Sequence, residues 1–332
     1  MKAIRFEKFG DPSEVLRPVE MPVHQPGPGE VRVRMIASPI NPSDLLTIRG
    51  KYGVMPLLPF TPGYEGVGIV EAAGPGLIGK FYVGRRVAVL SQTGGNWAEY
   101  TVVPALRVVP VAKDLPDEQV ASFFVNPATV LAMVRHVLGV PKGAWLLQSA
   151  AGSTLGRMII KLGRHDGFRT INVVRRREAI AELKGLGADA VICPADGPIG
   201  DQVRGVVGDD GVKYAVDPVG GDTGTGLFDS LGEDGRMLVY GTLEQKPLEI
   251  DPRRMIAGKR VVEGFYLGHW AAARSKVKML LLFREIADLI RKGVLATELG
   301  HEFPLGAIGD AVREAEKVGR RGKVLLRIAP KL

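Results

Sequence analysis

Two stretches in the middle of the chain have residue types suited to holding a phosphorylated nucleotide. The first, LLQSAAGSTLGRMIIKLG at residues 146–163, passes from apolar residues through small residues into an amphipathic pattern. That order predicts a buried strand, a tight turn and a helix. Small side chains in the turn let the backbone approach a phosphate, and unpaired N–H groups at the helix start bind the anion. A tight turn without a ligand is the alternative, but its position at the first strand of an alternating series favours binding.

The second stretch, INVVRRR at residues 171–177, ends in three consecutive cations. A site for NAD usually has Asp or Glu at the end of this strand to hold the ribose 2′-hydroxyl, and this chain has neither there. A guanidinium group instead pairs with a phosphate through two hydrogen bonds. Three cations at the start of a helix also oppose the helix dipole, which favours a binding role over a merely solvated helix start. Arg175, Arg176 and Arg177 therefore predict a preference for NADPH over NADH.

Two other stretches resemble the dinucleotide fingerprint G-x-G-x-x-G but lack its structural context. GPGLIG at residues 74–79 matches every letter and follows a strand-like run. The residues after it, KFYVGRRVAVL, have strand character without a helical period, so we interpret this stretch as a hairpin connection. GLGADA at residues 185–190 closes a predicted helix and leads into a strand, so Gly187 is predicted to be a helix C-cap.

The predicted elements around these stretches define an α/β domain. From Gly143 to about residue 266, strand patterns alternate with helical patterns, which is typical of βαβ units and of a doubly wound parallel sheet. Strands are predicted at 144–150, 168–174, 189–193, 213–217, 236–241 and 261–266, and helices at 154–163, 178–186, 199–207 and 221–231.

The segments on either side of this domain have a different texture. Residues 1 to about 115 are rich in Pro and Gly and carry short alternating apolar runs, which predicts a β-rich domain. Helical patterns follow at 117–124 and 128–138. The last ~65 residues predict two amphipathic helices, VKMLLLFREIADLIRKG and AIGDAVREAEKVG, and a final strand, GKVLLRIAP. We infer that this C-terminal segment rejoins the β-rich domain, which makes the α/β domain an insertion.

The composition of the chain excludes several other functions. Its 332 residues are 45% hydrophobic and 24% charged, and Cys193 is its only cysteine. One cysteine excludes an internal disulfide framework and a multi-cysteine zinc site, and it fits a reducing, cytoplasmic environment. No apolar run has membrane-spanning length, and MKAIRFEKFG has no signal-peptide core. The net charge is +8, but the cations are dispersed without interleaved aromatic residues, so we expect no nucleic-acid partner and no membrane partner.

Stretches spread over nearly the whole chain resemble the medium-chain dehydrogenase/reductase superfamily. They are INPSDLLTIRGKYGVMP, PFTPGYEGVG, VNPATVL, QSAAGSTLG, RTINVVRRRE, DPVGG, VYGTLEQKP and EGFYLGHW. Within the superfamily, the chain is most similar to the trans-2-enoyl thioester reductases of the mitochondrial type and to bacterial relatives often named quinone oxidoreductases. The resemblance implies a GroES-like β domain, residues 1–118 and 268–332, together with a Rossmann domain, residues 119–267.

The resemblance implies NADPH as the cofactor and indicates the residues that contact it. They are Asn126, Gly152, Ser153, Thr154, Leu155, Arg175, Arg176, Arg177, Tyr240, Gly241, Thr242, Leu243, Phe265, Tyr266, Leu267 and Lys323. Two positions depart from the family pattern. Thr154 stands where relatives usually have Gly, which concerns the approach to the pyrophosphate. Phe265–Tyr266 replaces a Phe–Trp pair of some enoyl reductases, which concerns the pocket near the nicotinamide.

The resemblance also indicates a member without zinc. Asn41 stands where zinc-dependent relatives have their first Cys ligand, and Tyr64 stands where a GHE motif has His, which leaves Glu65 alone. The five histidines (His24, His136, His165, His269 and His301) show no metal-like spacing. Asn41 and Tyr64 are predicted to line the substrate pocket, together with Trp270, for which a core position is an equally good interpretation.

Where metal ligands are lacking, reduction of an activated C=C bond is easier chemistry than oxidation of an alcohol. Hydride from the nicotinamide attacks the β carbon of an α,β-unsaturated carbonyl, and the resulting enolate needs a proton. Tyr52, in RGKYGVMP, matches the proton donor of the enoyl reductases, and a phenol is protonated at neutral pH. The residues alone favour a surface loop tyrosine, and the surrounding motif favours the catalytic role. The predicted activity is NADPH-dependent reduction of small-molecule 2-enoyl thioesters.

Two alternatives stay open. An NADPH:quinone reductase on the same fold would reduce a flat quinone and would not require Tyr52. A catalytically silent NADPH-binding protein would bind the cofactor and pass its electrons to no acceptor. The family further implies a homodimer, formed by sheet extension through the edge strand near VVEGFY, residues 261–266.

Overall fold

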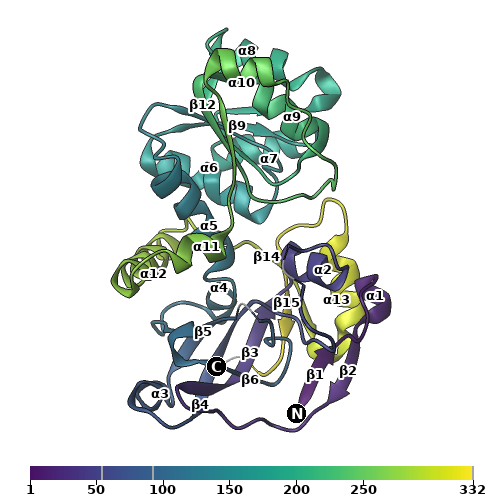
Figure 1. Ribbon diagram of the computed structural model, residues 1–332, viewed down its shortest axis with the longest axis vertical. Helices are drawn as coiled ribbons and strands as arrows, with labels where there is room; N and C mark the ends of the chain where they lie inside the picture. The colour runs from purple at the N-terminus through teal and green to yellow at the C-terminus, as the bar shows by residue number, and fades with distance from the viewer. Residues whose placement is uncertain (54, 92, 331–332) are drawn as a thin grey trace. The chain divides into compact units, whose positions relative to one another are not determined.

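The computed structural model describes residues 1–53, 55–91 and 93–330, which form two compact units (Figure 1). The first unit comprises Met1–Val125, Phe283–Arg291 and Ala296–Leu332, and the second comprises Asn126–Leu282 and Lys292–Leu295. The first unit is therefore assembled from both ends of the chain. The domain limits at residues 118 and 267 stay a prediction.

The second unit is built on a six-stranded sheet in which all neighbouring strands are parallel. The spatial order is β10-β9-β8-β11-β12-β13, so the chain builds outward from β8 and then returns to extend the sheet on the other side of β8. The strands are β8 Trp145–Gln148, β9 Arg169–Val173, β10 Ala190–Ile192, β11 Val212–Asp217, β12 Leu231–Val239 and β13 Val261–Gly264. This sheet confirms the α/β fold class and the six predicted strands.

Helices cover both faces of this sheet, as a doubly wound fold requires (Figure 1). Helices α6 and α7 pack with one buried cluster, which includes Ile160 and Leu183, whereas α8 and α9 pack with another, which includes Val203 and Phe228. Gly187, with φ 106°, ends α7 and confirms the predicted C-cap. The helices are α5 Val125–Leu131, the π-helical turn η2 Ala132–Val137, α6 Thr154–Asp166, α7 Ala179–Leu186, η3 Pro194–Asp196, α8 Ile199–Val207, α9 Gly221–Asp229, α10 Pro252–Gly258 and α11 Leu267–Ala272, with α12 Lys276–Arg291 running on into the first unit.

The first unit contains a seven-stranded sheet and a separate pair, β1 and β2. The large sheet has the order β14-β15-β3-β4-β5-β7, with β6 also paired to β3. The C-terminal strand β15 pairs antiparallel with β3, with Leu326 opposite Ser38, so the predicted last strand completes the N-terminal sheet. The strands are β1 Lys2–Arg5, β2 Arg17–Glu20, β3 Glu30–Pro39, β4 Glu65–Ala73, β5 Arg86–Leu90, β6 Tyr100–Pro104, β7 Val108–Pro110, β14 Leu299–Pro304 and β15 Lys323–Arg327.

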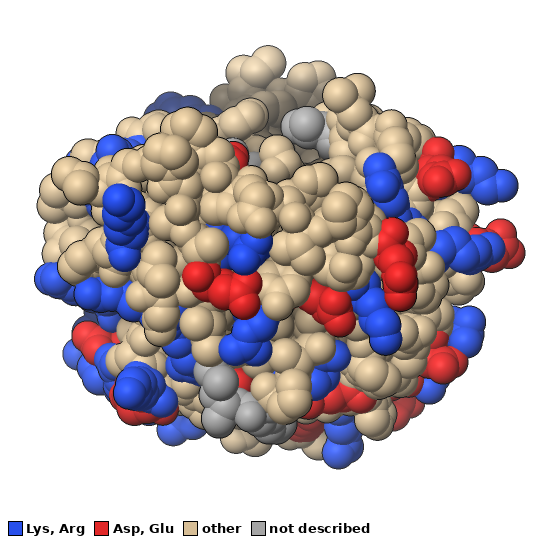
Figure 2. Space-filling view, turned by 90° about the horizontal axis from the view of Figure 1, so that it is seen from below, with Lys and Arg blue, Asp and Glu red and all other residues tan. Residues whose placement is uncertain are grey.

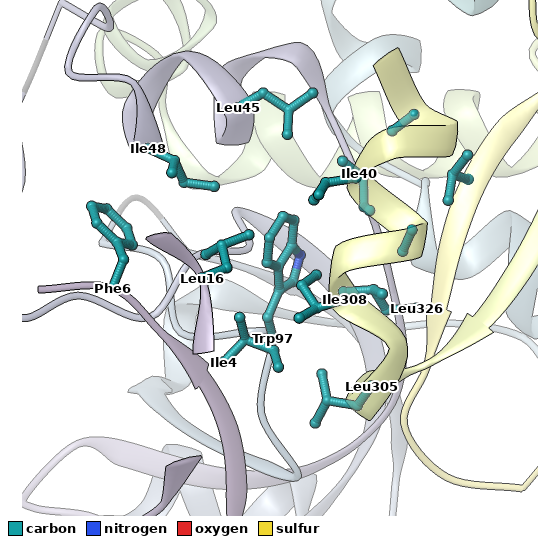
Figure 3. Packing of buried hydrophobic residues seen from close by; sticks show 14 residues of the cluster. Ile4, Phe6, Leu16, Ile40, Leu45, Ile48, Trp97, Leu305, Ile308 and Leu326 are labelled. Atoms are coloured by element: carbon teal, nitrogen blue, oxygen red, sulfur yellow. The ribbon is translucent and has the colours of Figure 1, made fainter. Parts of the chain in front are cut away.

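The core of the first unit joins residues from both chain ends (Figure 3). Trp97 is fully buried and lies among Ile4 of β1, Ile40, which precedes α2, and Ile308 of α13. This packing holds α2, which carries several of the polar residues described below, against the C-terminal helix. The helices of this unit are α1 Pro12–Val15, α2 Pro42–Ile48, α3 Leu77–Tyr82, η1 Ala105–Arg107, α4 Asp117–Ala121, η4 Leu305–Ala307 and α13 Ile308–Glu316.

The connection that contains GPGLIG differs in part from expectation. Strands β4 and β5 are antiparallel neighbours, so the stretch does join the strands of a hairpin. However, Leu77–Tyr82 form helix α3, and the residues at its end do not have the strand character expected of them. Helix α3 has only six residues, which is too short to establish a helical period in the sequence, and its apolar side chains are exposed, Leu77 at 87%. Within the described ranges, the chain contains no helix long and apolar enough to cross a membrane.

Candidate nucleotide-binding edge and buried polar site

The carboxyl ends of β8 and β11 form the point where the strand order of the parallel sheet reverses. Ser149, just after β8, donates a hydrogen bond through Oγ to Asp217 at the end of β11. The same carboxylate accepts from the N–H groups of Val219 at 3.0 Å and Gly220 at 2.9 Å. Asp217 therefore fixes the two turns that flank this edge of the sheet.

The turn between β8 and α6 leaves the start of the helix open. Ser153 caps α6, because its hydroxyl accepts from the N–H of Gly156 at 3.1 Å. Gly156 permits close packing of helix on turn, since a Cβ there would lie 2.6 Å from the Ala151 carbonyl oxygen. Gly152 is exposed, and a Cβ on it would meet no atom within 4 Å. The backbone at Gly152 and the first N–H groups of α6 therefore leave room for a phosphate, whose binding here stays a prediction.

The three arginines after β9 are all exposed but differ in their contacts. Arg177 donates from Nε to Asp196 at 2.6 Å, and this carboxylate raises the pKa of the Arg177 guanidinium above its ordinary value. Arg175 and Arg176 form no ion pair or side-chain hydrogen bond with any residue that the structure describes. Two of the three cations are thus available for an anionic ligand, and the third is already paired.

The segment after β12 lies along the turn that follows β11. The N–H of Tyr240 donates to the Asp217 carbonyl at 2.9 Å, and the N–H of Leu243 donates to the Pro218 carbonyl at 2.9 Å. Gly241 allows this approach, because a Cβ there would lie 2.8 Å from the Pro218 carbonyl oxygen. Burial and the charge of Asp217 raise the pKa of the Tyr240 phenol, which keeps it neutral. Tyr240, Gly241, Thr242 and Leu243 therefore lie at the carboxyl edge of the sheet.

The remaining predicted residues of the second unit are at or beyond the end of β13 and in α5. Phe265 directly follows β13, and its N–H donates to the Val239 carbonyl at 2.7 Å. Tyr266 and Leu267 begin α11, and Asn126 is in the first turn of α5. Their contacts with a cofactor stay a prediction.

Trp270 on α11 is half-buried, and its indole Nε1 is buried with no hydrogen-bond partner among the described residues. The Arg274 guanidinium lies 3.5 Å from the centre of its ring system, and the His136 ring centre lies 5.6 Å away. Desolvation lowers the pKa of Arg274. The side chain is thus packed by a cation on one side, and its role in a substrate pocket stays a prediction.

A separate cluster of buried polar residues lies in the first unit. Lys323 of β15 is 2% exposed, and its ammonium donates to Asn41 Oδ1 at 2.6 Å. The Asn41 side-chain amide donates to Glu65 Oε1 at 3.0 Å, and the Asn41 N–H donates to Asp44 Oδ2 at 2.8 Å. Glu65 Oε2 also accepts from the N–H of Val125 at 2.8 Å. One lysine and two carboxylates therefore share a site with little access to water.

Burial dominates the protonation of this cluster. It raises the pKa of Asp44 to about 7, against the opposing hydrogen bond from the Asn41 N–H and the positive charge of Lys323. Burial also raises the pKa of Glu65 and lowers the pKa of Lys323 to about 8. These directions follow from the cost of ionising groups away from water. The cluster can therefore change its net charge near neutral pH.

Tyr64 joins this cluster to Tyr52. The Tyr64 N–H donates to Asp44 Oδ1 at 3.2 Å, and its hydroxyl is hydrogen-bonded to Thr47 Oγ1 of α2 at 2.7 Å. The ring of Tyr52 lies with its centre 6.0 Å from that of Tyr64. Helix α2 thus positions one tyrosine by a direct hydrogen bond, and the second tyrosine packs against the first.

The donor set of this cluster does not fit a zinc ion. Both polar atoms of the Asn41 side chain are engaged, one by Glu65 and one by the Lys323 ammonium. An ammonium beside Asn41 would repel a divalent cation, and neither a thiol nor an imidazole belongs to the cluster. Across residues 1–53, 55–91 and 93–330, no three His, Cys, Asp or Glu side chains are grouped so as to hold a metal.

Sequence reasoning missed Asp217, Ser149, Asp44 and Thr47 as parts of these sites. Asp217 is an acidic residue at the end of the strand predicted at 213–217, and this position could have indicated that it belongs to the site. Asp44 and Thr47 had no such signal, because their importance comes from contacts with Tyr64, 20 and 17 residues away.

Comparison with known proteins identifies related sequences for both units. Residues 27–113 match the alcohol dehydrogenase GroES-like domain family, and residues 154–282 match the zinc-binding dehydrogenase family. The chain is 33% identical over 329 residues to the mitochondrial enoyl-[acyl-carrier-protein] reductase of Arabidopsis thaliana, covering 96% of this chain and 87% of the relative. It is 30% identical over 321 residues to the human enzyme of the same name, covering 96% and 86%.

Solved structures of similar proteins cover the chain almost completely. A Bacillus thuringiensis protein, provisionally assigned as an NADPH:quinone reductase, has a TM-score of 0.92 at 32% identity and covers 99% of both chains. A mycobacterial protein solved in complex with NADPH has a TM-score of 0.89 at 29% identity and covers 99% of this chain and 100% of its own.

Proposed function

The chain belongs to the medium-chain dehydrogenase/reductase family, and we propose that it uses NADPH to reduce the C=C bond of 2-enoyl thioesters. Its relatives in this family are oxidoreductases, and two of them with 33% and 30% identity are named enoyl-[acyl-carrier-protein] reductases. The buried cluster around Asn41 lacks the donors of a zinc site, so no step of the proposed reaction uses a metal.

The carboxyl edge of the parallel sheet would hold the cofactor. The start of α6, with Gly152, Ser153, Thr154 and Leu155, would bind the pyrophosphate through backbone N–H groups. Arg175 and Arg176 would bind the 2′-phosphate that distinguishes NADPH from NADH. Tyr240–Leu243 and Phe265–Leu267 would lie along the rest of NADPH, with Asn126 as a further contact. A contact of Lys323 with the cofactor stays a prediction from the sequence. NADPH supplies the hydride.

Tyr52 would supply the proton that completes the reduction. Hydride addition to the β carbon moves the C=C electron pair onto the α carbon and the thioester carbonyl. The Tyr52 hydroxyl then gives its proton to the α carbon, and the tyrosinate regains a proton from water, so one C=C bond becomes two C–H bonds. Packing against Tyr64, which Thr47 holds through its hydroxyl, supports a defined position for Tyr52. Asn41 and Tyr64 would line the substrate pocket, and a contact of Trp270 with the substrate stays a prediction from the sequence.

The observation that carries the proposal is the pair of arginines, Arg175 and Arg176, which lack partners among the described residues at the end of β9. Two cations just before a helix oppose its dipole, and a phosphate bound beside them would supply a favourable negative charge. The substrate class rests on the names of the relatives and on the position of Tyr52.

An NADPH oxidation screen tests this function. The substrates are crotonyl-CoA, longer enoyl-CoAs, simple enones and 1,4-benzoquinone, each measured with the native protein and with Tyr52→Phe. We expect the native protein to reduce enoyl thioesters. Tyr52→Phe should lower kcat on these substrates by roughly 100-fold or more, because a general acid contributes about 10²–10⁴-fold to a rate. The affinity for NADPH should change little. Equal turnover by the two proteins would remove Tyr52 from the mechanism.

The second candidate is an NADPH:quinone reductase, supported by the assignment of the Bacillus thuringiensis structure. In that case benzoquinone would be reduced at the same rate with or without the Tyr52 hydroxyl, and enoyl thioesters would not be reduced. A catalytically silent NADPH-binding protein would bind NADPH, and none of the acceptors in the screen would cause NADPH to be oxidised. A cytoplasmic location and a homodimer, formed through the edge of β13, complete the proposal.

A further inference from the structure

The exposed face of α3 is a feature of the first unit that the proposed function does not use. Leu77, Ile78 and Phe81 project from this helix with exposed fractions of 87%, 54% and 63%. Leu106 of the adjacent turn η1 is 58% exposed. We refer to these four residues as the α3 cluster. Exposed apolar side chains gathered in this way mark a surface that binds something, whereas scattered ones carry no such meaning.

Cations border the α3 cluster. Residues 74–86 include Lys80, Arg85 and Arg86 and contain no Asp or Glu. The Arg85 guanidinium lies 3.8 Å from the centre of the Phe81 ring, so a positive charge is held beside an exposed apolar side chain. Glu30, which lies close to α3, accepts a hydrogen bond from the backbone of its own turn at 2.9 Å. Figure 2 shows a face of the molecule on which Lys and Arg side chains lie among uncharged areas, many of them beside Asp and Glu side chains.

A groove of about 810 Å³ adjoins the cluster at Arg85, and Lys113 lies on its wall. Its acidic residues are already neutralised, because Asp117 pairs with Arg86 at 2.6 Å and Glu118 pairs with Arg327 at 2.9 Å. Arg85 and Lys113 form no ion pair with any residue that the structure describes. The groove therefore offers two available cations beside the apolar cluster.

We propose that the α3 cluster docks the protein on a membrane surface that contains anionic lipids. Inserted Leu, Ile and Phe side chains with cations at headgroup level are the features that give reversible binding to such surfaces. A standard protein interface uses roughly 20–30 residues on each side, and the cluster is much smaller. A second copy of the same basic surface would be repelled. The proposal departs from our expectation of no membrane partner, because the sequence does not reveal which apolar residues are exposed.

Docking at α3 leaves the reaction untouched. Glu65, next to Tyr64, begins β4, whereas Ala73 ends it beside α3. Nine residues of strand separate the two ends by roughly 27 Å. Substitutions in the α3 cluster should therefore change membrane binding and not turnover, so failure of this proposal and failure of the proposed function are distinguishable.

Sedimentation with vesicles tests the proposal. Vesicles of equal parts phosphatidylglycerol and phosphatidylcholine are compared with vesicles of phosphatidylcholine alone. We expect at least 10-fold stronger partition onto the anionic vesicles, lost at 0.5 M salt. The double variant Leu77→Ser/Phe81→Ser should lower this partition at least 10-fold, and Lys80→Glu/Arg85→Glu should do the same. The matched control, Ile256→Ser on α10, removes an apolar side chain that is 79% exposed and should bind as the native protein does. The Tm of each variant, measured by circular dichroism, reports whether it is folded.

Three results would overturn it. If the native protein does not bind anionic vesicles at millimolar lipid, the proposal is wrong, and an acidic protein becomes the candidate partner of the α3 cluster. Equal binding by the native protein and by Leu77→Ser/Phe81→Ser would show that another surface is responsible. Self-association that disappears in the same double variant would show that the cluster is a contact between copies of this chain.

Discussion

At the end of β9, three arginines that are equivalent in the sequence differ in what they contact. Arg177 is paired with Asp196, whereas Arg175 and Arg176 have no such partner among the described residues. A cation that already has a carboxylate gains less from a phosphate than one that has only water. The triplet therefore divides into a pair for the ligand and one residue that anchors the loop.

This division predicts unequal effects of substitution. Arg175→Ala/Arg176→Ala should weaken NADPH binding by roughly 100-fold or more, because the variant removes two charge-assisted hydrogen bonds of about 1.5–3 kcal/mol each and about 1.4 kcal/mol is a factor of ten. Binding of NADH, which lacks the 2′-phosphate, should change little. Isothermal titration with both nucleotides measures the two affinities.

Arg177→Ala is the matched control within the same loop, with an expected loss of NADPH affinity well below that of the double variant. A double variant that binds NADPH as tightly as the native protein would contradict the assignment of the 2′-phosphate site.

The buried carboxylate of Asp44 predicts a pH dependence of stability. Its pKa is raised from 3.8 to about 7, so between these values the folded state holds a proton that the unfolded state has lost. The contribution of Asp44 to the free energy of unfolding is then fully present below about pH 4. It falls as the pH rises toward 7, by at most about 1.4 kcal/mol per pH unit. The lowered pKa of Lys323 acts at higher pH, where stability rises between about 8 and 10.5.

Thermal unfolding of the native protein and of Asp44→Asn at pH 5 and pH 7 measures this contribution. The Tm of the native protein should fall more between the two pH values than the Tm of Asp44→Asn. Parallel pH profiles would show that Asp44 is ionised throughout, as an exposed carboxylate would be.

At the scale of the elements, the turn between β8 and α6 and the first turn of α6 contain two glycines with different structural roles. Gly156 lets the helix pack closely on the turn, and Gly152 faces open space. We expect Gly156→Ala to lower the Tm, since its Cβ would lie 2.6 Å from a carbonyl oxygen. Gly152→Ala should leave the Tm within a degree or two and weaken NADPH binding instead. Unfolding with and without NADPH separates the two effects, and equal loss of Tm in both variants would contradict this account.

The six strands of the second unit and helices α6 to α9 could be predicted because their signals are local, whereas the short helices α10 and α11 were not predicted. Each strand is a short apolar run bounded by turn residues, and glycine ends such as Gly187 mark helix boundaries. Helix α3 was not predicted, because its six residues are too few to establish a helical period. The cluster of Lys323 and Asn41 joins residues 282 positions apart, and Ser149 and Asp217 lie 68 apart. No local pattern encodes such contacts, so these sites needed the structure.

At the scale of the whole molecule, the edge of the parallel sheet at β13 predicts the oligomeric state. Strand β13 pairs only with β12 within the described sheet, and Val261 is 40% exposed. An unpaired strand edge can pair with another chain, and charged side chains on it oppose such pairing. Val261→Lys should therefore shift a homodimer toward monomer, as measured by analytical ultracentrifugation.

Ile256→Lys, which adds the same charge at an exposed site on α10, is the control and should leave the dimer unchanged. A dimer that withstands Val261→Lys would place the interface elsewhere.

The assembly of the first unit from both chain ends has a consequence for its biosynthesis. Residues 126–282, nearly all of the parallel-sheet unit, leave the ribosome as one uninterrupted segment and can fold as they emerge. Strand β15 is translated after the whole of the second unit. Until then β3 can pair with β4 and β6 but not with β15, and Asp44 and Glu65 lack the positive charge of Lys323. The N-terminal part of the first unit, residues 1–125, therefore stays incomplete while residues 126–282 are synthesised.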